Sequence, residues 1–305
     1  MIKLNKASLT IVIPIYEGIE FIDDLLEAIR KQTVKADEIV FVISKVGKTD
    51  EFIEKLNSNN LKNIKYELIE PSYPGKARNI GVEISTSEWI AFLDQRTLPS
   101  KEWLETLIEV SDNGRYRFVG GLRTCTADTN YKRILKASTY GNAPARVLSG
   151  SLVSKELFIL TKGFLPNVRA GEDWEWINRI PEIEVTWLNK PMIIYSGLPA
   201  SLIETIKKWF RYSYENSKIN ILYAEKFFYF LILLILTLYF SYSWNFVFTS
   251  GQWDQSPYFI PHLNKIVWGA SLFLYLVYRG LIRPLTFDEK LNYLLPINWI
   301  IIGLN

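Results

Sequence analysis

The sequence predicts an α/β domain, built on a mostly parallel sheet with helices on both faces, that is followed by C-terminal transmembrane helices. Two observations lead to this fold class. Up to about residue 195, short β-rich runs alternate with amphipathic segments, and strands that alternate with helices build a parallel sheet covered on both faces. Residues 227–253 then contain no charged side chain, and this run is longer than the ~20 residues that a helix needs to cross a bilayer.

The composition excludes several other classes of protein. Of the 305 residues, 49% are hydrophobic, which is enough for a large core and excludes a disordered chain. The net charge of +3 is too small for the concentrated basic field that binds nucleic acid, so we expect no nucleic-acid partner. Cys125 is the only cysteine and His262 the only histidine, which excludes an intrachain disulfide and a Cys/His metal site. Any bound metal must be held by oxygen atoms.

Residues 1–198 form the predicted α/β domain. The expected strands occupy residues 9–15, 38–43, 64–69, 89–93 and 118–119, and the expected helices occupy residues 21–32, 50–57, 76–84 and 101–110. In such sheets ligands bind beyond the carboxyl ends of the strands. The chemistry is therefore expected at three turns that follow strands, at residues 14–17, 44–50 and 94–96.

Residues 199–226 are expected to be an amphipathic segment at a membrane surface. A helix over residues 201–218 would place Leu202, Ile206 and Phe210 near one face, with lysines and arginines on the rest. This pattern suits a helix in the membrane interface. A helix that packs on the α/β domain has the same pattern and stays open as the alternative.

Residues 227–305 are the predicted membrane domain. Two transmembrane helices are expected at about residues 227–249 and 263–282, followed by a short apolar segment at residues 291–305 whose membrane role stays open. Lysines and arginines cluster before the first span and after the second. By the positive-inside rule both flanks are cytoplasmic. We therefore expect an integral membrane protein whose α/β domain lies in the cytoplasm.

Two patterns of the α/β domain suit a ligand site. The run TIVIPIYEG ends a strand at Pro14 and leaves Tyr16 and Glu17 at the carboxyl edge of the sheet. The run PGKARNIGVE places a glycine-containing loop before a helix, whose backbone N–H groups and positive dipole end suit a diphosphate. Lys76 and Arg78 add positive charge to this helix start.

Together with FLDQR at residues 92–96 and GEDWEW at residues 171–176, these patterns resemble the GT-A glycosyltransferases of family 2, in that family's order, over about residues 9–196. The resemblance implies a Rossmann-like GT-A fold and inverting transfer of a sugar, a hexosyltransferase-type reaction, from a nucleotide-sugar donor. The donor-binding residues that it implies are Pro14, Tyr16, Glu17, Ser44, Lys76, Arg78, Asn79, Asp94 and Arg96. Asn79 would bond either to the nucleotide or to its own loop.

The sequence departs from the family at the metal site. The family carries Asp-x-Asp after the fourth strand, where the last carboxylate holds Mg²⁺ or Mn²⁺, but this chain has Asp94, Gln95 and Arg96. Either Asp94 holds a metal with help from other acids, or the planar fork of Arg96 neutralises the donor phosphates in place of a metal. Ser44 and Lys45 also replace expected acids after the second strand, so a third alternative is that donor binding is lost.

The resemblance assigns the acceptor side to GEDWEW. Asp173 would be the base that takes the proton from an attacking sugar hydroxyl, and Glu172 would hold the loop or touch the acceptor. Acceptor contacts are further expected from Gly150, Ser151, Trp174, Trp176, Lys208 and Arg211. As an alternative that stays open, Lys208 and Arg211 would assist the departing nucleoside diphosphate instead. A base favours a hydroxyl acceptor on a lipid-linked or polymeric glycan, in the synthesis of cell-surface polysaccharide or glycolipid.

Two alternatives stay open. In a polyprenyl-phosphate monoglycosyltransferase the attacking group is the phosphate of the acceptor. This phosphate is already ionised, so the enzyme would need no base. A non-catalytic membrane subunit that binds a nucleotide or a sugar would explain the missing second aspartate at Arg96.

Overall fold

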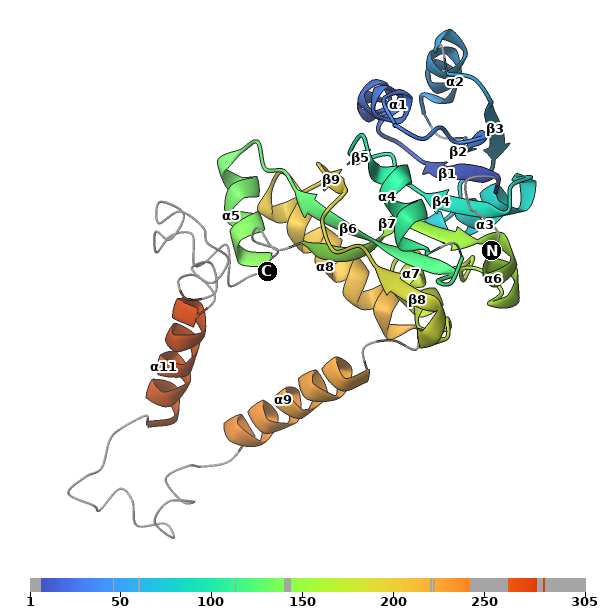
Figure 1. Cartoon of the computed structure of the whole chain (residues 1–305). Helices are drawn as coiled ribbons and strands as arrows, with labels where there is room; N and C mark the ends of the chain where they lie inside the picture. The colour runs from blue at the N-terminus through green and yellow to red at the C-terminus, as the bar shows by residue number, and fades with distance from the viewer. Residues whose placement is uncertain are drawn as a thin grey trace, which may run out of the picture.

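The computed structural model describes residues 7–45, 47–59, 61–112, 114–139, 144–219, 221, 223–241, 263–278 and 282. The first part of the chain forms an α/β domain around one sheet. The helices α9 (Tyr223–Ser241) and α11 (Leu263–Val277) extend away from this domain (Figure 1).

In the described residues, nine strands form one sheet in the order β3-β2-β1-β4-β7-β6-β9-β5, with β8 paired to β6. The first half of the sheet is parallel, as predicted, and consists of β3 (Ile64–Ile69), β2 (Glu38–Ser44), β1 (Leu9–Ile15) and β4 (Trp89–Phe92). Each of these strands is within one residue of its predicted bounds. The apolar runs of β1, β2 and β4 are typical of strands buried on both faces, whereas β3 alternates apolar and polar residues and is partly exposed.

The second half of the sheet is mixed, so the prediction of a mostly parallel sheet is wrong for this half. Its strands are β7 (Ala145–Ser154), β6 (Phe118–Cys125), β9 (Ile193–Tyr195), β5 (Thr97–Pro99) and β8 (Val185–Trp187). β7 runs antiparallel to both β4 and β6, and β9 runs parallel to β6 but antiparallel to β5. The predicted strand at residues 118–119 is too short, because β6 continues through two glycines to Cys125.

Helices cover both faces of the sheet, as predicted. α1 (Ile22–Arg30), α2 (Thr49–Ser58) and α4 (Trp103–Val110) pack on one face, and α3 (Pro74–Ile84), α6 (Lys155–Leu160) and α7 (Glu172–Ile177) pack on the other. The first four of these helices are the four that the hydrophobic periodicity predicts. The remaining elements of this domain are η2 (Ile19–Phe21), α5 (Asn130–Thr139) and η3 (Glu182–Glu184).

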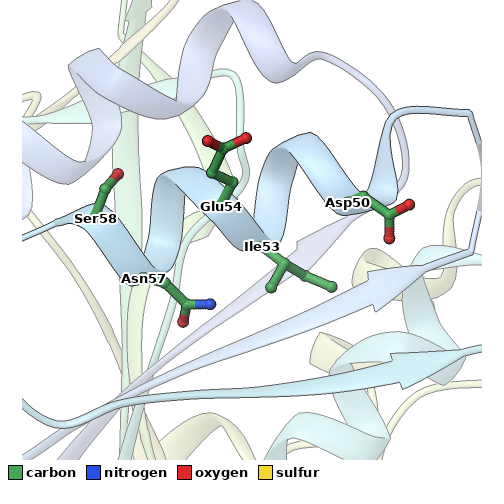
Figure 2. Close-up of a pocket in the computed structure, with 5 residues that line it drawn as sticks. All are labelled: Asp50, Ile53, Glu54, Asn57 and Ser58. Atoms are coloured by element: carbon green, nitrogen blue, oxygen red, sulfur yellow. The ribbon is translucent and has the colours of Figure 1, made fainter.

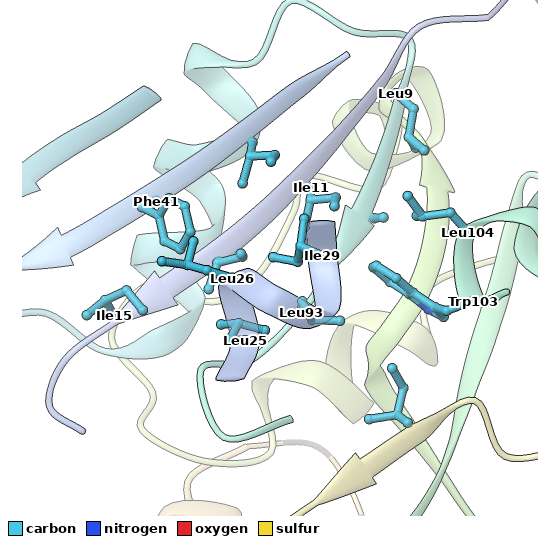
Figure 3. Packing of buried hydrophobic residues seen from close by; sticks show 14 of the residues in the cluster. Leu9, Ile11, Ile15, Leu25, Leu26, Ile29, Phe41, Leu93, Trp103 and Leu104 are labelled. Atoms are coloured by element: carbon cyan, nitrogen blue, oxygen red, sulfur yellow. The ribbon is translucent and has the colours of Figure 1, made fainter. Parts of the chain in front are cut away.

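β1 contributes to both layers of the core, because successive side chains of a strand point to opposite faces. Ile11 and Ile15 lie against the apolar side of α1 (Figure 3), whereas Val12 lies against α3. A Cβ at Gly81 would lie 2.4 Å from Val12 Cγ1, so glycine lets α3 approach β1 closely. Burying one isoleucine or leucine side chain contributes roughly 1.5–3 kcal/mol. This packing fixes the carboxyl ends of the strands, where the site lies.

Ser201 is the N-cap of α8 (Leu202–Ser217). Its hydroxyl accepts a hydrogen bond from the Glu204 N–H at 3.3 Å. Of the helices that the structure describes, none has both the length and the apolar composition needed to cross a membrane. The predicted transmembrane helices at residues 227–249 and 263–282 gain no support from this part of the chain and lie partly outside the described residues. The predicted apolar segment at residues 291–305 lies wholly outside them.

Candidate active site

The turn after β1 and the turn after β4 are joined at the carboxyl edge of the sheet. The Tyr16 N–H donates to Gln95 Oε1 at 3.2 Å. Gly18 has a φ of 94°, and a Cβ there would lie 2.7 Å from Gln95 Nε2, so this close approach requires glycine. Tyr16 is 45% exposed, Glu17 is exposed beside it, and Pro14 is partly buried within β1. Tyr16 and Glu17 are accessible to a ligand, and their role in donor binding stays a prediction.

Arg78 of α3 joins two acids that lie far apart in the sequence. Its Nη2 donates to Asp94 Oδ1 at 2.7 Å, and its Nη1 donates to Glu172 Oε1 at 2.9 Å. Asp94 follows β4, and Glu172 begins α7. Arg78 is only 6% exposed, and its guanidinium lies 5.7 Å from the centre of the Phe164 ring. The ion pairs therefore link the predicted donor side of the site to the predicted acceptor side.

Burial and charge set the protonation of this group. Burial opposes the positive charge of Arg78, but the carboxylates of Asp94 and Glu172 outweigh it and raise the pKa of the guanidinium above its ordinary value. Burial raises the pKa of Glu172 to about 7, although Arg78 acts in the opposite direction. Burial also raises the pKa of Asp173, with Arg78 opposing this rise. Carboxyl groups with raised pKa values suit proton transfer near neutral pH.

Asp173 lies at the start of α7, partly buried, and its Oδ1 accepts the Trp174 N–H at 2.8 Å. Gly171 precedes the helix with a φ of 83°. A Cβ at Gly171 would lie 2.5 Å from Asn216 Oδ1 of α8. Glycine is therefore required for α7 to begin close to α8.

Trp174 and Trp187 form an aromatic surface next to Asp173. Trp174 is 40% exposed, and its ring stacks on Trp187 with 5.9 Å between centroids and an interplanar angle of 24°. The Arg146 guanidinium lies 4.9 Å from the centre of the Trp187 ring. Trp187 is half-buried, so only the exposed part of Trp174 is accessible to a ligand, and its predicted acceptor role stays a prediction.

Trp176 lies in the core, and the prediction that it contacts the acceptor is wrong. It has no exposed surface, and its Nε1 donates to Thr161 Oγ1 at 2.9 Å. Its ring packs against those of Phe92, Phe118, Phe158 and Phe164. Trp174 and Trp176 are two positions apart on one helix, which places their side chains on nearly opposite faces.

Four other predicted contact residues are part of the framework. Asn79 does not face a nucleotide, because its amide donates to the Phe164 carbonyl at 2.8 Å and accepts the Phe164 N–H at 2.9 Å. Ser44, Gly150 and Ser151 are buried, and the predicted contacts of these three with a ligand stay predictions. Gly150 accepts a hydrogen bond from a tryptophan of α4. Lys76 is exposed at the start of α3, where its donor role stays a prediction.

Lys208 and Arg211 of α8 lie beside aromatic rings near the carboxyl end of β9. Lys208 Nζ is 5.7 Å from the centre of the Tyr195 ring, and the Arg211 guanidinium is 5.8 Å from the centre of the Tyr212 ring. The Arg123 guanidinium lies on the same Tyr195 ring at 4.5 Å. The sequence did not reveal Arg123 or Tyr195, because only the pairing of β6 with β9 brings them together.

The residues at the Asp-x-Asp position do not fit a divalent metal. The Asp94 carboxylate is paired with Arg78, and the Gln95 amide oxygen is bonded to Tyr16. Arg96, which stands where the family has a direct ligand, carries a positive charge that repels a cation. Within the described part of the chain, no three acidic, histidine or cysteine side chains lie close enough together to hold a metal ion.

Figure 2 shows a hollow on the outer side of α2. All of its lining residues come from this one helix, and they are Asp50, Ile53, Glu54, Asn57 and Ser58. The hollow lies apart from α7 and β9 (Figure 1). It contains none of the paired acids or cations described above, and we assign it no role.

The sequence matches a known family, glycosyl transferase family 2, over residues 10–162. An uncharacterised glycosyltransferase of Rickettsia conorii is 26% identical over 188 residues, which are 56% of this chain but 29% of the relative. The amylovoran biosynthesis glycosyltransferase AmsB of Erwinia amylovora is 29% identical over 123 residues, which are 38% of this chain and 41% of AmsB. The chain therefore spans less than half the length of either relative.

The mannosyltransferase PcManGT of Pyrobaculum calidifontis, solved in complex with GDP-Man and Mn²⁺, has a similar structure. Its TM-score is 0.55 at 16% sequence identity, over 98% of this chain and 87% of that one. At this identity the likeness concerns the fold alone, and it confirms the predicted α/β fold of the GT-A type.

Proposed function

The chain belongs to glycosyl transferase family 2, and on this premise we propose that it transfers a hexose from a nucleotide-sugar donor to a hydroxyl group of a lipid-linked or polymeric glycan. The proposed reaction inverts the anomeric carbon. One observation carries this proposal: Asp173 lies at the carboxyl edge of the sheet, beside an arginine that joins its neighbour Glu172 to Asp94.

In the proposed mechanism Asp173 is the base. Its carboxylate takes the proton from the acceptor hydroxyl as that oxygen forms a bond to the anomeric carbon. The bond from the anomeric carbon to the diphosphate breaks, and the nucleoside diphosphate leaves with the electron pair. Arg78 holds Glu172 and Asp94 in place, so it is a positioning residue in this scheme. Positively charged side chains beside the departing nucleoside diphosphate stabilise its negative charge.

The donor and acceptor classes have separate support. PcManGT was solved with GDP-Man, a nucleotide sugar. AmsB is named for the synthesis of a polysaccharide, amylovoran. Trp174, which is 40% exposed beside Asp173 and stacks on the half-buried Trp187, offers a surface for the acceptor sugar.

We further propose that the α/β domain works at the cytoplasmic face of a membrane, attached through α8 and the apolar segments that follow it. Ile203, Ile206, Phe210 and Tyr214 are all exposed, by 66%, 49%, 74% and 56%. Their spacing of three and four residues places them along one side of α8. An exposed apolar stripe of this kind suits the interface of a bilayer.

The experiment that tests the reaction is sugar transfer by the purified full-length chain, with a panel of nucleotide sugars and of glycan acceptors. Asp173→Asn is expected to lower kcat about 100-fold or more, because it removes the base. Glu182→Gln, at an exposed acid outside the site, is the matched control and is expected to keep full activity. Unchanged turnover in Asp173→Asn would remove Asp173 from its role. Transfer to bare polyprenyl phosphate that survives this substitution would instead select the monoglycosyltransferase.

The experiment that tests attachment is flotation of the full-length chain with liposomes that contain anionic lipid. Phe210→Ser is expected to reduce the bound fraction, whereas Ile159→Ser, at an apolar residue on α6 that is 62% exposed, is expected to leave it unchanged. A chain that stays at the bottom of the gradient with every lipid composition would contradict the attachment.

A further inference from the structure

Four basic side chains from three separate segments meet at the carboxyl end of β9. Tyr195 of β9 pairs with Thr97 of β5 on one side and with Cys125 of β6 on the other. The Ser196 N–H donates to the Arg96 carbonyl at 3.2 Å, which places the turn after β4 against the end of β9. α8 lies beside these strands (Figure 1) and brings Lys208 over the Tyr195 ring. The four side chains that meet here are Arg96, Arg123, Lys208 and Arg211.

The positive charges of this group act on one another. Burial is the main cause that lowers the pKa of Lys208 to about 8, and Arg123, Arg211 and Arg96 lower it further. In the part of the chain that the structure describes, neither Lys208 nor Arg96 nor Arg211 forms an ion pair with a carboxylate. Like charges that are partly buried together raise the free energy of the site.

Arg96 also has an unused donor. Its Nε is buried and has no hydrogen-bond partner among the described residues. Its guanidinium lies 5.5 Å from the centre of the Phe21 ring, which holds the planar group from one side. A buried N–H without a partner destabilises the fold, and an anion that accepts a hydrogen bond from it removes this cost.

We propose that Arg96, Arg123, Lys208 and Arg211 form the site that binds the diphosphate of the donor, and that they do so without a divalent metal. This inference rests on the proposed function, in which the donor is a nucleotide sugar. Of the two roles open to Lys208 and Arg211, it selects the one at the nucleoside diphosphate, and it adds Arg123, which the sequence did not single out.

The position of the cations supports this assignment. Arg96 is two residues after Asp94, at the end of β4, and this is where the family carries the metal ligand. The planar fork of an arginine binds phosphate oxygens in pairs. Asp94 is already paired with Arg78. Its carboxylate is therefore balanced by an arginine and needs no metal ion to balance its charge. The charge that a metal supplies in other members of the fold is here supplied by side chains.

The test is titration calorimetry of the purified full-length chain with UDP and with GDP, once in EDTA and once in excess Mn²⁺. The affinity for the better nucleotide is expected to agree within about twofold between the two conditions. Lys208→Met is expected to weaken binding about tenfold, because a charge-assisted hydrogen bond is lost. Lys208→Arg keeps the charge and is expected to restore most of the affinity. Lys207→Met, at the exposed neighbouring lysine, is the matched control and is expected to bind as the unchanged chain does.

The outcomes separate this inference from the proposed function. Binding that appears only with Mn²⁺ would overturn the metal-free site and leave the glycosyltransferase standing. Binding that is the same in Lys208→Met and in Arg96→Gln would also overturn the site, provided that both variants melt at the temperature of the unchanged chain. A folded chain that binds neither nucleotide under either condition would overturn the site and the proposed donor together.

Discussion

Arg78 and Glu172 form a buried ion pair with 2.9 Å between Nη1 and Oε1, although 94 positions separate them in the sequence. The same guanidinium also holds Asp94, so one side chain of α3 fixes the end of β4 and the start of α7. Removing one member of such a pair leaves a charge buried without a partner.

Arg78→Met is therefore expected to lower the free energy of unfolding by about 3–5 kcal/mol. Arg30→Met breaks the exposed pair of Arg30 with Glu27 and is expected to change the free energy of unfolding much less than Arg78→Met does. Urea denaturation of both variants measures the difference. Equal losses of unfolding free energy in the two variants would mean that the buried pair stabilises the fold no more than the exposed pair does.

Glu172 makes the stability depend on pH in a defined direction. Its pKa is raised from an ordinary value of 4.5 to about 7, so the folded state binds a proton that the unfolded state has already released. Its contribution to stability is therefore full below pH 4.5 and is lost as the pH rises from 4.5 to about 7.

Glu172→Gln is expected to flatten this part of the pH profile, since glutamine does not titrate. The measurement is the free energy of unfolding between pH 4 and 8, taken at about half-unit steps. Glu182→Gln, at an exposed residue, is expected to keep the slope of the unchanged chain. An unaltered slope in Glu172→Gln would assign the pH dependence to another group.

Asp173 is expected to set the acid limb of the activity profile. A base must be ionised, so activity falls as the pH drops through its pKa. Burial raises this pKa above the ordinary aspartate value of 3.8, and the limb is therefore expected above that pH. The measurement is kcat/KM against pH in the unchanged chain and in Glu182→Gln, which should give the same limb. A profile that is flat down to pH 4 would contradict the role of a buried base.

Trp174 and Trp176 are expected to respond differently to substitution. Trp174→Ala removes an exposed stacking face and is expected to raise the KM for the acceptor about threefold to tenfold, with little change in stability. Trp176→Ala opens the core and is expected to lower the free energy of unfolding by about 3–5 kcal/mol. Steady-state kinetics with the acceptor varied, together with thermal melting, separates the two effects. A KM that is unchanged in Trp174→Ala would place the acceptor elsewhere.

The sequence predicts the first half of the sheet well and the second half poorly. β1 and β3 have their predicted bounds. The apolar, mostly β-branched run of β1 identifies a buried strand, whereas β3 alternates apolar and polar residues and is partly exposed. β7 contains Ser149, Gly150 and Ser151 at buried positions. Serine and glycine have low strand propensity, so their pattern does not predict a strand. β8 and β9 have three residues each, which is too short for a periodic signal.

In the candidate site, too, the sequence reveals the residues that carry a local signal and misses those placed by contacts between distant segments. The motifs reveal Arg78, Asp94 and Asp173, because each lies at a turn or a helix start that the sequence marks. They do not reveal Arg123, because its place depends on the register between β6 and β9. Nor do they reveal that Trp174 is exposed and Trp176 buried, since only the packing of α7 on the sheet decides this.

The shared guanidinium of Arg78 also has a thermodynamic meaning. Because its Nη1 and Nη2 donate to carboxylates on two sides, whatever draws it towards Asp94 weakens its hold on Glu172. The donor half with Asp94 and the acceptor half with Glu172 then share one positive charge. Binding of a ligand in the donor half is therefore linked to the proton affinity of Glu172 in the acceptor half. By reciprocity, a proton taken up at Glu172 changes the affinity of the donor half by the same factor.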